Sequence, residues 1–232
     1  MNRLNLEEID VDGAIRESAE AVSGDTRLGF LKKAGLTGGA AIGGGAVLSA
    51  FAPSLAGAAS STRPPASFGK GDVGILNYAL TLEYLERAFY QEAADKGQIS
   101  DPATSEFLKL VLADEKAHVA FLRKALGSKA AKKPKFDFKG IPSDEKKFKL
   151  TAAVLENTGV HAYFGQAGNI AKPAYLKAAA SILTIEARHD GIIGFLNNSA
   201  SAKSITPTGP FDTPYSAAKV LKAVKATGFL VG

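Results

Sequence analysis

The chain of 232 residues is 46% hydrophobic, carries a formal net charge of +5 and contains no cysteine. The lack of cysteine excludes disulfides and thiolate metal ligands, so the core and any bound metal must hold the folded domain together. The length is that of one domain with a sizeable core, preceded by a segment that is not part of it.

Residues 26–33 resemble a twin-arginine export signal in which Leu28 follows Arg27 where a second arginine is expected. The next 29 residues, 34–62, are uncharged and rich in Gly and Ala, and Ala56-Gly57-Ala58 fits a cleavage site. We therefore expect 1–58 to be an export signal and disordered N-terminus, and 59–71 to be a linker. The mature protein would then be periplasmic, attached to the cell envelope or secreted. The alternative is an uncleaved membrane anchor, since the uncharged run is long enough to span a bilayer.

Helical patterns dominate 72–200, and strands have little support anywhere. Asp72 and Ser143 are candidate N-caps, while Gly97 and Gly127 are candidate helix ends. The predicted helices cover about 73–96, 103–126, 144–170 and 174–198. Their connections are short, long and short, and the long one, 128–142, has the length of a crossover between the two halves of a bundle. The sequence therefore predicts an all-α fold, a four-helix bundle with a long crossover between its second and third helices.

Two further segments are described by their composition. Nine lysines lie between Lys124 and Lys149, in and around the crossover. Because an exported protein rarely meets nucleic acid, we expect no nucleic-acid partner, and either a solvated surface or contact with anionic cell-envelope polymers. The remainder, 201–232, is predicted to be a C-terminal loop and a short helix over 215–226, of a kind that usually packs across a bundle end.

Glu115, His118, Glu186 and His189 form two Glu-x-x-His motifs that are 71 positions apart. A spacing of three puts the carboxylate and the imidazole of each motif on one helix face. Hydrophobic residues continue both faces at helical intervals, so the four polar side chains lie in stripes that should face the core.

A lone glutamate lies on each of the other two helices, Glu83 on the first and Glu156 on the third. Each is followed seven residues later by a tyrosine, Tyr90 and Tyr163, so the order Glu…Tyr, Glu-x-x-His occurs twice. We interpret this as a helical hairpin used twice. The tyrosines are interpreted as core aromatics, with a hydrogen bond to a ligand or a redox role as the alternative.

Four carboxylates that converge in a core repel one another unless a cation is present. Together with two imidazoles they match the ligand pattern of di-metal carboxylate bundles, and mixed oxygen and nitrogen donors suit two Fe or two Mn ions. Glu86 is a further candidate ligand or else a surface charge. His161, five residues after Glu156, is expected to pack or to face solvent. The alternative for the whole set is a buried hydrogen-bond network without metal.

Segments 75–86, 114–122, 156–163 and 185–189 resemble the ferritin-like superfamily, and more narrowly its bacterial ferritin-like and desiccation-related proteins. This resemblance implies a di-iron or di-manganese site that handles oxygen, peroxide or ferrous iron. It implies that Glu115 and Glu186 bridge the two metals. The terminal ligands would then be Glu83, His118, Glu156 and His189.

Two classes of function remain open. One is a di-metal oxidoreductase of the ferroxidase or the peroxidase and catalase type, active in stress protection. The other is a non-catalytic structural or desiccation-protection bundle with a vestigial or structural site. A homo-oligomer is compatible with both, although one sequence does not reveal the cage that iron storage needs.

Overall fold

The computed structural model describes residues 62–96, 98–198, 201–206 and 209–231. The expected export signal, its cleavage site and the alternative membrane anchor lie outside these residues. Within the described ranges, no helix combines the length and the hydropathy that crossing a membrane requires.

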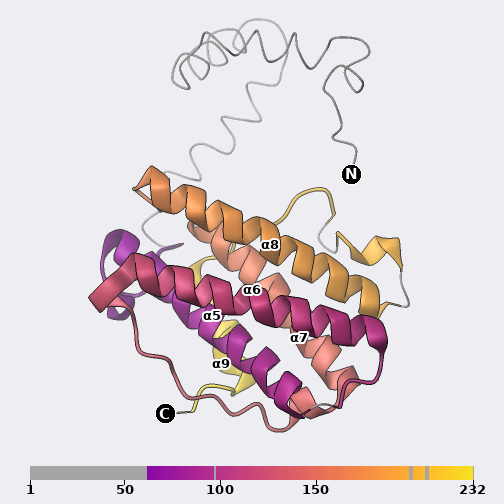
Figure 1. The fold of residues 1–232 in the computed structure, drawn as a ribbon. Helices are drawn as coiled ribbons and strands as arrows, with labels where there is room; N and C mark the ends of the chain where they lie inside the picture. The colour runs from indigo at the N-terminus through magenta and orange to yellow at the C-terminus, as the bar shows by residue number, and fades with distance from the viewer. Residues whose placement is uncertain (1–61, 97, 199–200, 207–208, 232) are drawn as a thin grey trace, which may run out of the picture. The chain divides into compact units, whose positions relative to one another are not determined.

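Four long helices form a bundle (Figure 1). Helix α5 packs along α6, and α7 packs along α8, so the bundle consists of two helical hairpins that face each other. In the part of the chain that the structure describes, the only β-type pairing is an isolated bridge between Phe136 and Leu230. The predicted all-α bundle is confirmed. The bounds of the helices are Gly71–Lys96 for α5, Pro102–Leu126 for α6, Glu145–Ala167 for α7 and Pro173–Asn197 for α8.

The starts of two helices differ from the sequence prediction. Helix α5 already begins at Gly71, so Asp72 lies in its first turn and is not its N-cap. The Asp72 carboxylate instead accepts hydrogen bonds from the backbone N–H groups of Ala171 and Lys172, at 2.8 and 2.9 Å, and so fixes the turn between α7 and α8. Ser143 belongs to a short 3-10 turn, and the N-cap of α7 is Asp144.

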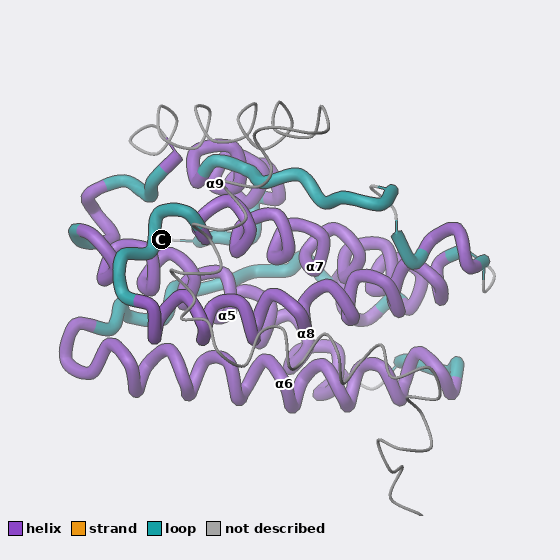
Figure 2. Tube along the Cα trace, turned by 90° about the horizontal axis from the view of Figure 1, so that it is seen from above, coloured by secondary structure: helices purple, strands orange, loops and turns teal. Residues whose placement is uncertain are grey.

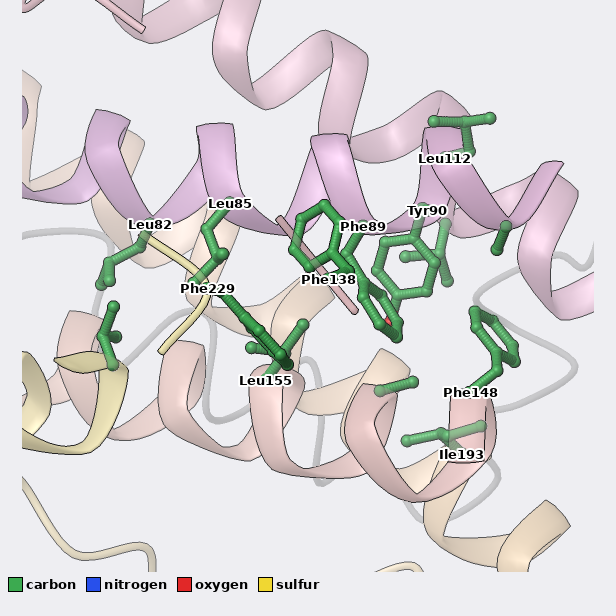
Figure 3. Close-up of a cluster of buried hydrophobic side chains, with 14 of the residues drawn as sticks. Leu82, Leu85, Phe89, Tyr90, Leu112, Phe138, Phe148, Leu155, Ile193 and Phe229 are labelled. Carbon is green, nitrogen blue, oxygen red and sulfur yellow. The ribbon is translucent and has the colours of Figure 1, made fainter. Parts of the chain in front are cut away.

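The crossover between α6 and α7 is anchored by aromatic side chains. Phe138, in the crossover, is buried and packs edge-on against Phe89 of α5 at 5.4 Å between ring centroids. Phe229, near the end of the described chain, packs against Phe138 at 5.2 Å. Figure 3 shows both rings between the helices, close to Leu85, Phe89 and Leu155. The predicted long crossover is therefore held along its path by the core of the bundle.

The C-terminal helix α9 (Ala217–Thr227) starts at a cap in which Ser216 accepts a hydrogen bond from the Lys219 N–H. It packs against α7, and Figure 2 shows it on the far side of the bundle from α6. Ala217, Val220 and Val224 are buried in the main hydrophobic cluster. The apolar side of α9 is thus turned into the domain.

Candidate metal centre

The six residues predicted as ligands come together inside the bundle, one or two from each helix. We call them the donor cluster: Glu83, Glu115, His118, Glu156, Glu186 and His189. They form two overlapping groups of four side chains, and within each group one donor atom per residue lies within 4.8 Å of the others. One group contains Glu83 and His118, the other contains Glu156 and His189, and both contain Glu115 and Glu186. The arrangement therefore has two halves that share two glutamates.

The two shared glutamates are the least satisfied polar groups of the cluster. Both are fully buried, at 0% exposure, and none of their four carboxylate oxygen atoms makes a well-formed hydrogen bond with a described residue, although His118 Nδ1 lies 3.1 Å from Glu186 Oε1. A buried carboxylate without a partner costs several kcal/mol on general grounds, roughly the desolvation penalty of an uncompensated ion. The oxygen atoms of these two side chains are therefore in a position to bind a cation.

Both histidines turn Nδ1 toward the cluster. His118 Nδ1 lies 3.2 Å from Glu83 Oε2 and 3.1 Å from Glu186 Oε1. His189 Nδ1 lies 3.2 Å from Glu156 Oε2 and 3.6 Å from Glu115 Oε1. Each half of the cluster therefore presents one imidazole nitrogen beside one lone glutamate and the shared pair.

The two predicted tyrosines contact the cluster directly. Tyr90 donates a hydrogen bond to Glu156, and Tyr163 donates one to Glu83. Both rings are buried. The structure agrees with both of the first two interpretations, since each tyrosine packs in a hydrophobic cluster and also donates a hydrogen bond to a cluster glutamate. Each of these bonds connects one hairpin to the other.

Glu86 is buried rather than at the surface, with 3% exposure. It approaches Glu186 at the point where α7 carries Gly159: a Cβ at this position would lie 3.1 Å from both Glu86 Oε1 and Glu186 Oε2. The lack of a side chain at Gly159 leaves the room that these two carboxylates occupy. Glu86 is thus next to the donor cluster but outside both groups of four.

The crowding of acids changes their protonation. Burial and the charge of Glu186 raise the pKa of Glu115 well above its usual value, and burial raises the pKa of Glu186 to about 8 despite the opposing contact with His118. Burial, followed by the charges of Glu186 and the other cluster glutamates, raises the pKa of Glu86 well above its usual value. For all three acids, burial and mutual repulsion therefore favour the protonated form over the charged form.

For the two histidines and Glu83, contacts with neighbouring charged groups shift the pKa in the direction opposite to the effect of burial. Burial lowers the pKa of His189, but the hydrogen bond and charge of Glu156 outweigh this and raise it to about 9. Burial also lowers the pKa of His118, but the hydrogen bonds and charges of the surrounding glutamates outweigh burial and raise this pKa strongly. Burial raises the pKa of Glu83, yet its hydrogen bond with His118 lowers it overall.

Two polar residues near the donor cluster were not predicted from the sequence. Asp114 Oδ2 lies 3.1 Å from His189 Nε2, the ring nitrogen that faces away from the cluster. Asp190 is buried and accepts a hydrogen bond from Asn157 Nδ2 at 3.0 Å, and burial raises its pKa to about 6. The only signal for either was an acid directly beside a motif residue, and that carries little information because neighbours in a helix point in different directions.

His161 behaves as the sequence indicated for a packing residue. Its ring is buried and stacks on Tyr215 at 4.1 Å between centroids. It belongs to neither group of potential ligands.

The donor set is of a kind that could bind metal. Carboxylate oxygens and imidazole nitrogens are the donors that iron and manganese accept, and the two shared glutamates belong to both groups of potential ligands. Bundles with a glutamate from each of two helices and Glu-x-x-His from each of the other two are a known di-metal architecture.

Comparison with protein families agrees with this geometry. A family model described as a ferritin-like domain matches residues 71–199, which is more than half of the chain and includes all four long helices. No curated protein sequence matches the chain.

Proposed function

The chain belongs to the ferritin-like family, and on that premise we propose that it binds two iron or two manganese ions in the donor cluster and uses them on oxygen, peroxide or ferrous iron. The observation that carries the proposal is the pair of glutamates, Glu115 and Glu186, which are completely buried, belong to both groups of donors and make no well-formed hydrogen bond with a described residue outside the donor cluster.

The residues divide into roles according to their positions. Glu115 and Glu186 would bridge the two ions, because they are common to both halves. His118 with Glu83 would complete one position, and His189 with Glu156 would complete the other. Four carboxylates balance the charge of two divalent cations, which removes the repulsion that raises the pKa values of Glu115 and Glu186.

When bound, a pair of such ions supplies one-electron chemistry between the +2 and +3 states. The protein restricts which molecules can reach the donor cluster. All four glutamates of the donor cluster are completely buried, whereas His118 lines a surface pocket of about 490 Å³. This restricted access favours oxygen, peroxide or a single metal ion as the substrate over a large organic molecule.

The hydrogen bonds of the tyrosines hold the terminal ligands in place. Tyr90 and Tyr163 orient Glu156 and Glu83 through bonds across the two hairpins. Because these donors are buried, they keep the carboxylates directed at the cluster without admitting water.

Metal analysis of the full-length protein, purified without immobilised-metal affinity, tests the proposal. We expect about two iron or manganese atoms per chain. Glu186→Ala should lose both the metal and any consumption of peroxide or ferrous iron, whereas Glu106→Ala, at an exposed position of the same bundle, should retain them. Failure to bind metal, even after reconstitution, would contradict the proposal. Metal that affects only thermal stability would favour the non-catalytic stress-protection bundle instead.

We further propose that the protein acts outside the cytoplasm, on the basis of the signal-like residues 26–58. N-terminal sequencing of protein recovered from the cell envelope should show a start just after Ala58 if the signal is cleaved, and an intact N-terminus if the segment stays as a membrane anchor.

Contact with anionic envelope polymers is proposed for the lysines of the crossover. Lys129, Lys132, Lys133, Lys135 and Lys139 are all exposed. Binding of this kind should weaken steeply as salt is added, because it depends on charges that mobile ions screen. Binding that is unchanged by salt would contradict it.

A further inference from the structure

The two histidines of the donor cluster differ in the nitrogen that faces away from it. His189 Nε2 lies 3.1 Å from the Asp114 carboxylate on α6. Among the described residues, every ion-pair contact of His118 is made through Nδ1, and no carboxylate lies against its Nε2. An outer carboxylate therefore supports only one half of the cluster.

The difference follows from one position in the sequence. The two Glu-x-x-His motifs are 71 positions apart, and the same offset makes Ile185 in the second motif region the counterpart of Asp114 in the first. The structure agrees with this correspondence, because His118 and Ile185 line the same surface pocket. An isoleucine side chain accepts no hydrogen bond, so the outer side of His118 is left facing this pocket.

An outer carboxylate changes what an imidazole does as a ligand. By accepting a hydrogen bond from Nε2–H, the carboxylate selects the tautomer in which Nδ1 is free to bind a metal, fixes the ring orientation and makes Nδ1 a stronger ligand. Apart from Glu86, which lies beside the cluster at Gly159, the two halves are similar: each has one glutamate that accepts a hydrogen bond from a tyrosine, and both share Glu115 and Glu186.

Resting on the proposed function, we infer that the two metal positions are unequal. The position formed by His189 and Glu156 holds its ion firmly, with Asp114 as the positioning residue. The position formed by His118 and Glu83, next to the pocket, exchanges its ion. Loss of such an outer carboxylate typically costs about 10- to 100-fold in metal affinity, which is the difference expected between the two positions.

Titration of the metal-free, full-length protein with Mn²⁺ tests this inference, with free Mn²⁺ followed by its paramagnetic resonance signal. We expect two binding steps whose dissociation constants differ by about 10- to 100-fold. Two equal steps in the wild-type protein would overturn the inference while leaving the di-metal site intact. No binding at all would overturn the proposed function as well, so the two failures are distinguishable.

Two reciprocal variants show which half of the donor cluster gives rise to each Mn²⁺ binding step. Asp114→Ile copies the His118 half and should weaken the tight step until the two steps coincide. Ile185→Asp copies the His189 half and should strengthen the weak step. Glu106→Gln removes an exposed charge from the same helix as Asp114 and should leave both steps unchanged. A tight step that survives in Asp114→Ile, with the fold confirmed by circular dichroism, would refute the role of Asp114 without requiring that Ile185→Asp fold.

Discussion

Tyr90 on α5 donates a hydrogen bond to Glu156 on α7, in the other helical hairpin. Tyr163 on α7 donates the corresponding hydrogen bond to Glu83 on α5. The two hairpins are therefore joined at the donor cluster by a reciprocal pair of polar contacts, in addition to the hydrophobic packing between them. This relationship leads to a prediction about stability.

Tyr90→Phe should destabilise the metal-free protein by about 1–3 kcal/mol, because it removes the donor to the buried Glu156 Oε1 and leaves only the contact of Oε2 with His189. Urea unfolding measures the loss. Tyr78→Phe is the matched control: the Tyr78 hydroxyl is also buried but has no hydrogen-bond partner among the described residues, so its removal should cost little or nothing. Equal losses in the two variants would show that the bond to Glu156 contributes nothing to stability.

Metal affinity should rise with pH up to about 9. Binding requires the ionised form of Glu186 and the neutral form of His189, whose pKa values in the metal-free protein are raised to about 8 and about 9. At pH 7 both groups hold protons that the metal must displace. Calorimetric titrations in buffers of different ionisation enthalpy should therefore reveal proton release. Binding that releases no protons at pH 7 would show that the cluster is already ionised.

The metal-free protein should become less stable as the pH rises. Because the folded-state pKa of Glu186 is raised from 4.5 to about 8, the native state binds the additional proton between these values, and stability is lost as the pH rises through them. His189 acts in the same direction between 6.5 and about 9. Thermal melts between pH 5 and pH 9 measure this. The metal-loaded protein, in which the protons have been replaced, should not show the same decline.

Gly159→Ala should separate stability from metal binding. An alanine stabilises a helix by up to about 1 kcal/mol relative to glycine. Its Cβ would, however, lie 3.1 Å from carboxylate oxygens of Glu86 and Glu186, and both side chains would have to move. We therefore expect Mn²⁺ affinity to fall while the melting temperature of the metal-free protein stays the same or rises. Unchanged affinity would mean that the shared glutamate tolerates the displacement.

Local rules account for much of what the sequence predicts correctly. The spacing of three between Glu115 and His118, and between Glu186 and His189, puts each pair on one helix face regardless of the rest of the chain. Glycine and proline at 97, 102, 127 and 173 mark helix boundaries in the sequence to within a few residues of those observed. The two N-cap predictions were wrong, because the Asp72 carboxylate binds the turn between α7 and α8 and Ser143 belongs to a 3-10 turn.

Relations between helices required the tertiary structure. The sequence did not predict that Glu86 is buried against Glu186, that each tyrosine reaches the opposite hairpin, or that Asp114 contacts His189 while Ile185 occupies the matching position at His118. The residues of one helix are placed relative to each other by its 3.6-residue period. The rotation and offset of one helix against another depend instead on how the side chains of the whole core pack, and for this bundle that packing decides which donors meet.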